Sequence, residues 1–175
     1  MKIAKKISFS AILVAVAVVI LYFGSLIDVV TLSVAAVASF SVMITVAELG
    51  YFTGLGVYAA ASLLSLLLLP SKEAAVIFAA FFGFYPIVKG LADKLKKPLA
   101  YTVKTFVFMV SFTVSLLVFI FFFSLPPDKW FLYLLMIIPG LAVFYIYDYL
   151  FTKIIIYYFG TLRKKLGISK YFKQS

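Results

Sequence analysis

Long apolar runs separated by short charged connections dominate the hydrophobic pattern of this chain. A helix needs about 20 mainly apolar residues to cross the hydrocarbon of a membrane, which is about 30 Å thick. Six segments approach this length, and they cover residues 7–27, 29–47, 51–69, 74–92, 105–125 and 130–158. Apolar and polar positions do not alternate with period two, so the pattern does not favour a membrane β-barrel. The sequence therefore predicts an all-α integral membrane protein, a bundle of six transmembrane helices.

The composition supports this prediction. Hydrophobic residues make up 66% of the 175 residues and charged residues only 13%, whereas soluble domains are about 45–50% apolar and about 25% charged. A soluble domain of this length could not bury so much apolar surface. We therefore expect a single transmembrane domain over residues 1–175, with a basic cytoplasmic tail over residues 159–175.

The basic residues predict the orientation of the chain in a lipid bilayer. The formal net charge is +10, and with six spans 14 of the 16 cations fall on one side, leaving Lys72 and Lys129 on the other. Because basic residues favour the cytoplasmic face, we expect the protein in the cell (plasma) membrane with both termini on the cytoplasmic side. This interpretation explains the charge without nucleic acid. The basic face would also attract anionic lipid, and docking to an acidic cytoplasmic partner is the alternative.

The chain lacks the residues most often used for catalysis and metal binding. It contains no His and no Cys, so thiol nucleophiles and the usual transition-metal ligands are missing. Its six carboxylates are nowhere three or four residues apart, the spacing that would pair them on one helix face. No phosphate-binding glycine loop is present either. We expect no enzyme, no catalytic residue, no metal site and no cofactor.

Three of the charged residues inside or close to the predicted spans are candidates for a role at membrane depth. Asp148 lies ten residues before the expected inner end of the sixth span, a distance of about 15 Å along a helix. Lys104 lies at the start of the fifth span, and Lys153 follows Asp148 in the sixth. Charge at membrane depth is costly and often functional. We predict an ion pair of Asp148 with Lys104 or Lys153, either as a structural clamp or as a ligand or coupling contact; snorkelling of the side chains is the third alternative.

Aromatic and polar residues gather near the predicted outer boundary of the spans. These candidates for a solute site are Asp28, Trp130, Tyr133, Pro139 and Gly140. Tyrosine and tryptophan at this depth are also typical of the aromatic belt of membrane helices. A structural role is therefore the alternative to solute binding.

Proline and glycine indicate where two of the predicted helices are interrupted. The fourth span contains Gly83 and Pro86, and the sixth contains Pro139–Gly140. An interrupted membrane helix is tolerated only where protein or a water-filled cavity satisfies the freed backbone groups. We therefore expect the fourth and sixth spans to form cavity walls. In the third span, small residues such as Gly54 and Gly56 indicate close packing against a neighbouring helix.

The first span carries two alanines one helical turn apart, Ala11 and Ala15. With the short length, the six spans and both ends inside, this pattern resembles the substrate-binding S component of energy-coupling factor (ECF) transporters, a prokaryotic group of vitamin and cofactor importers. In that family, alanines with this spacing contact a transmembrane coupling subunit. The resemblance implies this role for Ala11 and Ala15, and it implies a coupling subunit and ATPases as partners. The stretches at 81–86 and 147–150 are also similar to an uncharacterised family of small six-span bacterial membrane proteins.

We therefore expect a membrane-embedded solute-binding subunit of an ECF-type uptake transporter. Because the predicted outer side offers few polar groups, its solute should be small and weakly polar. The alternative is a non-transport bacterial membrane scaffold, similar in format to the six-span morphogenesis protein of the rod-shape system. Such a scaffold would dock partners through the basic residues at 94–97 and 163–165.

Overall fold

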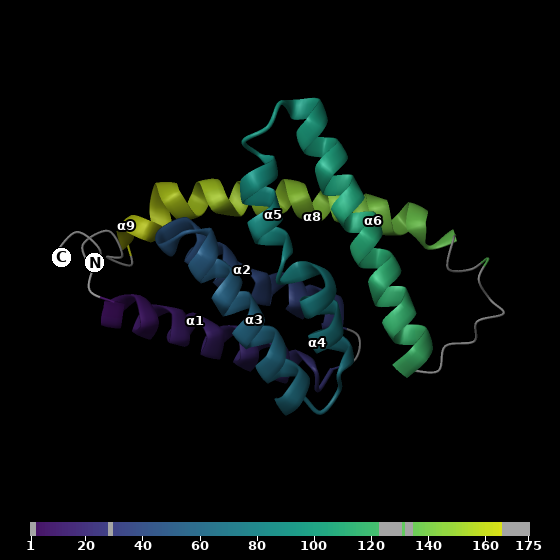
Figure 1. Ribbon diagram of the computed structural model, residues 1–175, viewed down its shortest axis with the longest axis horizontal. Coiled ribbons are helices and arrows are strands. Elements are labelled where there is room, and N and C mark those ends of the chain that lie inside the picture. Colours follow the sequence, from purple (N-terminus) through teal and green to yellow (C-terminus); the bar gives the residue numbers. More distant parts are fainter. Residues whose placement is uncertain (1–2, 28–29, 123–130, 132–134, 166–175) are drawn as a thin grey trace. The chain divides into compact units, whose positions relative to one another are not determined.

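The computed structural model describes residues 3–27, 30–122, 131 and 135–165. Within these ranges the chain forms helices joined by turns, and no strand occurs there (Figure 1). Six of the helical segments are long and apolar enough to cross a membrane. For the described residues, the prediction of helices with six apolar segments long enough to cross a membrane is confirmed, and this pattern is consistent with a multi-pass membrane protein.

The chain divides into two compact units. The larger unit covers Ala4–Leu125, and the smaller one combines Met1–Ile3 with Pro126–Ser175. The first five spans thus belong to the larger unit and the sixth to the smaller. The assembly of all six helices into one bundle stays a prediction, and the two units are described separately below.

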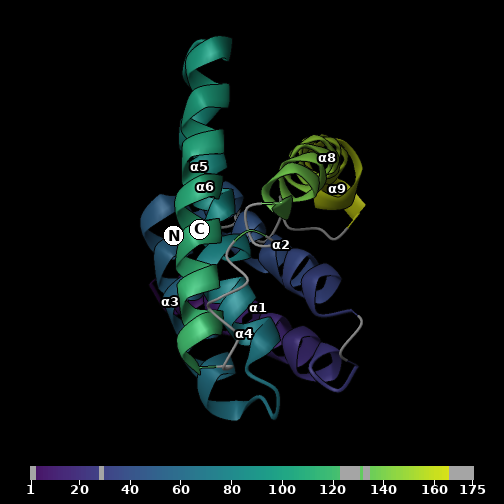
Figure 2. The same cartoon turned by 90° about the vertical axis from the view of Figure 1, so that its right-hand side faces the viewer.

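The larger unit is built around its second helix. Its helices are α1 (Ile3–Gly24), α2 (Thr31–Leu49), α3 (Tyr51–Leu68), α4 (Glu73–Ile77), the π-helix η2 (Phe78–Phe82), α5 (Tyr85–Ala92) and α6 (Lys97–Phe122). Helix α2 contacts α3, α4, η2 and α5, while α6 packs along α5 and η2 (Figures 1 and 2). The irregular fourth span therefore lies between α2 and α6.

Glycine brings α2 and α3 close together. Gly50 joins the two helices with a positive φ of 89°, a backbone conformation that favours glycine because it has no side chain. One turn later, a Cβ atom on Gly54 would lie 2.3 Å from Cγ2 of Val46, whereas one on Gly56 would meet nothing within 4 Å. The predicted close packing of the third helix is therefore confirmed at Gly54, while Gly56 faces open space.

The fourth span is interrupted where glycine and proline predicted it. The Gly83 amide donates to the carbonyl of Phe78, five residues earlier, at 2.7 Å, which is the hydrogen bond of a π-helix. Pro86 lies in the first turn of α5, where its missing N–H leaves no intrahelical hydrogen bond unmade. The Tyr58 hydroxyl of α3 donates to the Ala79 carbonyl at 2.7 Å. The neighbouring helix thus satisfies a carbonyl group inside the irregular segment.

The fifth helix begins earlier than its hydrophobic pattern predicts. We expected the span to start at residue 105, but α6 starts at Lys97. A proline in the first turn, Pro98, favours a helix start there, and the polar residues that follow are compatible with a helix. Lys104 consequently lies about two turns inside α6.

The smaller unit contains α8 (Ile137–Tyr157), the π-helix η4 (Tyr158–Leu162) and α9 (Arg163–Lys165). Pro139 lies in the first turn of α8, and the Gly140 amide donates to the Met136 carbonyl at 3.0 Å. A turn at Met136 directly precedes α8, and in the first turn of α8 the missing N–H of Pro139 has no intrahelical partner to lose. An interruption of the sixth span stays a prediction. Residues 166–175 of the predicted basic tail lie outside the described residues.

Candidate functional site

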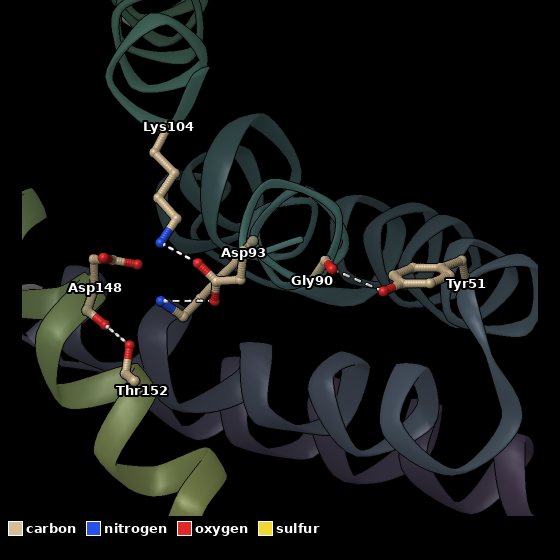
Figure 3. A network of polar contacts seen from close by, with 7 residues as sticks. Tyr51, Gly90, Asp93, Lys104, Asp148 and Thr152 are labelled. Carbon is tan, nitrogen blue, oxygen red and sulfur yellow. Dashed lines mark hydrogen bonds and ion pairs between the residues drawn. The ribbon is translucent and has the colours of Figure 1, made fainter. Parts of the chain in front are cut away.

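A cluster of charged residues joins α5 to α6 at one end of the larger unit (Figure 3). Lys104 Nζ lies 2.5 Å from Asp93 Oδ1, and Lys89 Nζ lies 3.6 Å from Asp93 Oδ2. The Lys89 side chain is 1% exposed and that of Lys104 is 7% exposed, while Asp93 is 46% exposed. A carboxylate at a helix C-terminus is opposed by the helix dipole. The two ammonium groups compensate for this position, so the cluster acts as a clamp between the two helices.

The first residue of α3 attaches to the same end of α5. The Tyr51 hydroxyl donates to the Gly90 carbonyl at 2.8 Å (Figure 3). A Cβ atom on Gly90 would lie 3.0 Å from Cε1 of the Tyr51 ring, so glycine at this position lets the ring pack closely against the α5 backbone. The Lys94 ammonium lies 4.7 Å from the Tyr51 ring centroid, a distance typical of a cation–π contact. Together, Tyr51 and the Asp93 clamp close this end of the unit.

Asp93 is the carboxylate that the structure pairs with Lys104, and it was not among the partners we expected. In the smaller unit, the Thr152 hydroxyl donates to the backbone carbonyl of Asp148 at 2.8 Å (Figure 3). The Lys153 ammonium lies 5.4 Å from the Tyr149 ring centroid. An ion pair of Asp148 with Lys104 or Lys153 stays a prediction. The available signal for the observed clamp was the spacing of Lys89 and Asp93, which favours an ion pair on one helix face.

An apolar groove lies at the opposite ends of α3 and α6. Its volume is about 600 Å³, and it is lined by Leu66, Lys72, Val76, Ala79, Ala80, Val114, Val118 and Phe122. Its walls come from α3, α4, η2 and α6 and from the turn before α4. The α6 wall presents residues at intervals of four, which places them on one face of the helix. Such a surface suits a ligand that is mostly apolar.

Lys72 is the charged residue among the described residues that line the groove. Its ammonium donates to the backbone carbonyls of Leu69 at 2.6 Å and Leu67 at 3.3 Å. These carbonyls belong to the C-terminal end of α3, where the last carbonyl groups of a helix lack intrahelical partners. A cation is favoured at this end by the helix dipole. The contacts hold the ammonium at the rim of the groove.

The groove lining, as far as the described residues define it, contains none of the residues that we predicted for a solute site. Asp28, Trp130 and Tyr133 lie outside the described residues, and Pro139 and Gly140 belong to the smaller unit. The fourth span forms a wall of the groove, as predicted, but the other walls are the third and fifth spans. The wall residues are ordinary aliphatic and small residues of membrane helices, so their sequence carried no signal beyond the interruption at Gly83 and Pro86.

Ala11 and Ala15 lie on the exposed side of α1. The buried residues of this helix are Leu13, Ala17, Leu21 and Gly24. A Cβ atom on Gly24 would lie 2.3 Å from Cγ1 of Val34, which shows that the end of α1 packs tightly against α2. The two alanines thus face away from this contact, and their contact with a coupling subunit stays a prediction.

No family model, no curated protein and no solved structure matches this chain.

Proposed function

We propose that the chain is a membrane-embedded subunit that binds a small, weakly polar solute for an ECF-type uptake transporter. The observation that carries the proposal is the apolar groove of about 600 Å³ between α3, the fourth span and α6. This volume falls within the range of about 300–1,000 Å³ that is common for small-molecule sites. Its aliphatic lining matches the weakly polar solute expected from the sequence.

The construction of the fourth span supports the proposal. The groove residues Ala79 and Ala80 belong to the π-helix η2, and π-helical turns occur frequently at functional sites. The turn at Gly83 and Phe84 separates this segment from α5. The groove wall is therefore a short irregular segment that is distinct from α5, which the Asp93 clamp holds to α6.

The exposed side of α1 supports the partner part of the proposal. Ala11 and Ala15 are exposed and one turn apart, so they form a shallow surface that another helix can approach closely. In an ECF-type assembly, this surface would bind the transmembrane coupling subunit, and separate ATPases would supply the energy for uptake.

Native mass spectrometry of the protein, gently extracted from its own membranes, tests the proposal. We expect a bound small molecule and co-purifying ATPases. Ala80→Leu should remove the small molecule by filling the groove, while Ala15→Leu should remove the partners and keep the small molecule. Ala59→Leu is the matched control, because Ala59 is an exposed alanine of α3 outside the groove. A protein that carries neither molecule nor ATPase, and that is unaffected by both variants, would contradict the proposal.

The scaffold is the second candidate, and one observation favours it. Lys94, Lys96 and Lys97 are exposed around the connection between α5 and α6, where they form a basic surface for an acidic partner. In the same experiment, a scaffold would retain protein partners that are not ATPases. Charge reversal at these three lysines should then release the partners, whereas Ala80→Leu should have no effect on them.

A further inference from the structure

We infer that the groove takes an amphipathic anion, with an apolar chain along α6 and a carboxylate or phosphate group at Lys72. This inference rests on the proposed function and specifies the chemical class of its solute. It depends on the position of Lys72. Among the described residues, the groove lining combines seven apolar residues with one ammonium group, that of Lys72.

The contacts of Lys72 fix its ammonium where a ligand headgroup would lie. Two of its three N–H donors have directions set by the carbonyls of Leu67 and Leu69, and an ammonium group carries three such donors. A carboxylate or phosphate oxygen at the third donor would form a charge-assisted hydrogen bond, which is stronger than a neutral one. Glu73 follows Lys72 in the sequence but is not a lining residue. An anionic headgroup is therefore the polar partner that the rim favours.

The rest of the groove suits an extended apolar chain. Val114, Val118 and Phe122 line it from α6, and the helix rise places the first and last of them about 12 Å apart. The opposite wall contains Ala79 and Ala80, whose short side chains leave the space open. A cationic headgroup would be repelled by Lys72, and a sugar-like ligand would leave its hydroxyl groups facing aliphatic walls without hydrogen bonds.

Photolabelling in micelles of a non-ionic maltoside detergent, which carries no phosphate or carboxylate, tests the inference with three probes of equal chain length. The probes are decanoate, decyl phosphate and decanol, each carrying a diazirine in the chain, and the labelled peptides are identified by mass spectrometry. We expect both anions to label residues 66–80 and 114–122 about tenfold more strongly than decanol, the ratio that one additional charge-assisted hydrogen bond supports. The ratio between the two anions then identifies the preferred headgroup.

Variants separate the headgroup contact from the groove itself. Lys72→Gln should reduce the labelling by both anions to the level of decanol, and Lys72→Arg should retain the preference for anions. Lys6→Gln is the matched control, because Lys6 is an exposed lysine of α1 that does not line the groove. Ala80→Leu should reduce the labelling by all three probes.

Three outcomes would overturn the inference, and the first two differ in what they say about the proposed function. Equal labelling by decanol and the two anions would reject the anion preference, while the groove would still bind an apolar solute. If none of the probes labels the groove peptides, the groove is not a binding site for such molecules, and the proposed function loses its main observation as well. Retention of the anion preference in Lys72→Gln would also reject the role of Lys72.

Discussion

The two ends of the larger unit use similar residues to opposite effect. The closed end is the one with Tyr51 and the Asp93 clamp. There the side chain of Val46 packs against Gly54, and the ring of Tyr51 packs against Gly90. The open end is the one with the apolar groove of about 600 Å³, and Ala79 and Ala80 line this groove. Small residues therefore do not by themselves produce either close packing or a cavity. The outcome depends on whether a neighbouring element brings a side chain into the space that the small residue leaves.

Charge follows the same division. At the closed end, Asp93 lies between two buried ammonium groups and joins α5 to α6. At the open end, Lys72 contacts only backbone carbonyls among the hydrogen bonds that the structure describes for it. Ion pairs thus stabilise the closed end, whereas the open end has a groove beside a charged side chain. Three substitutions at the closed end test this difference.

Loss of the Asp93 carboxylate should have the largest effect on the closed end. Asp93→Ala removes the shared partner of Lys89 and Lys104. We expect the free energy of unfolding to fall by about 2 to 3 kcal/mol, less than for a fully buried pair because Asp93 is partly exposed. Unfolding in detergent micelles measures this change. Asp93→Glu keeps the charge and should recover part of the loss, and an unchanged unfolding free energy in Asp93→Ala would show that the clamp is not stabilising.

The contact between α2 and α3 should respond to a single methyl group. Gly54→Ala places a Cβ atom 2.3 Å from Cγ2 of Val46, so we expect a loss of about 1 to 2 kcal/mol in unfolding free energy through overpacking. Gly56→Ala is the matched control in the same helix, because a Cβ atom there meets nothing within 4 Å. It should stabilise the protein by up to about 1 kcal/mol through helix propensity. The same unfolding assay should give opposite signs for the two variants, and equal effects would reject the tight contact.

Removal of one hydroxyl group should have the smallest effect. Tyr51→Phe deletes the hydrogen bond to the Gly90 carbonyl but keeps the aromatic ring below Lys94. We expect a loss of about 1 kcal/mol and faster amide hydrogen exchange at the C-terminal end of α5. The exposed tyrosine of α6, Tyr101, provides the control, since Tyr101→Phe should change neither measurement. If both variants behave alike, Tyr51 does not attach α3 to α5.

Much of the helical architecture could be predicted because hydropathy and local chemistry act over short distances. The number of spans follows from the length of the apolar runs, and the interruption of the fourth span follows from Gly83 and Pro86. The start of α6 could not be placed by hydropathy, because a helix can continue through polar residues such as Lys97 and Lys104 once a suitable first turn exists. Hydropathy marks where a chain can enter lipid, and it marks helix ends less well.

The candidate site was less predictable, because it depends on contacts between residues that are distant in the chain. The sequence directed attention to Pro139 and Gly140, yet the groove combines Leu66 and Val76 with Val118. Its residues are typical of any membrane helix, so no composition signal distinguishes them. The contact of Lys104 with Asp93 was not predicted for the same reason: Asp93 lies in a connection by sequence, and only the packing of α6 against α5 brings the two side chains together.

The sequence by itself determined that this chain is helical, that it has six apolar segments and that one of them is interrupted. These properties depend on backbone hydrogen bonding and on the free energy of apolar side chains, which local sequence specifies. Only the tertiary structure decided which small residues have a neighbouring side chain packed against them and which border a groove. It also placed Asp93 beside Lys104, because this contact depends on how α5 and α6 pack along each other.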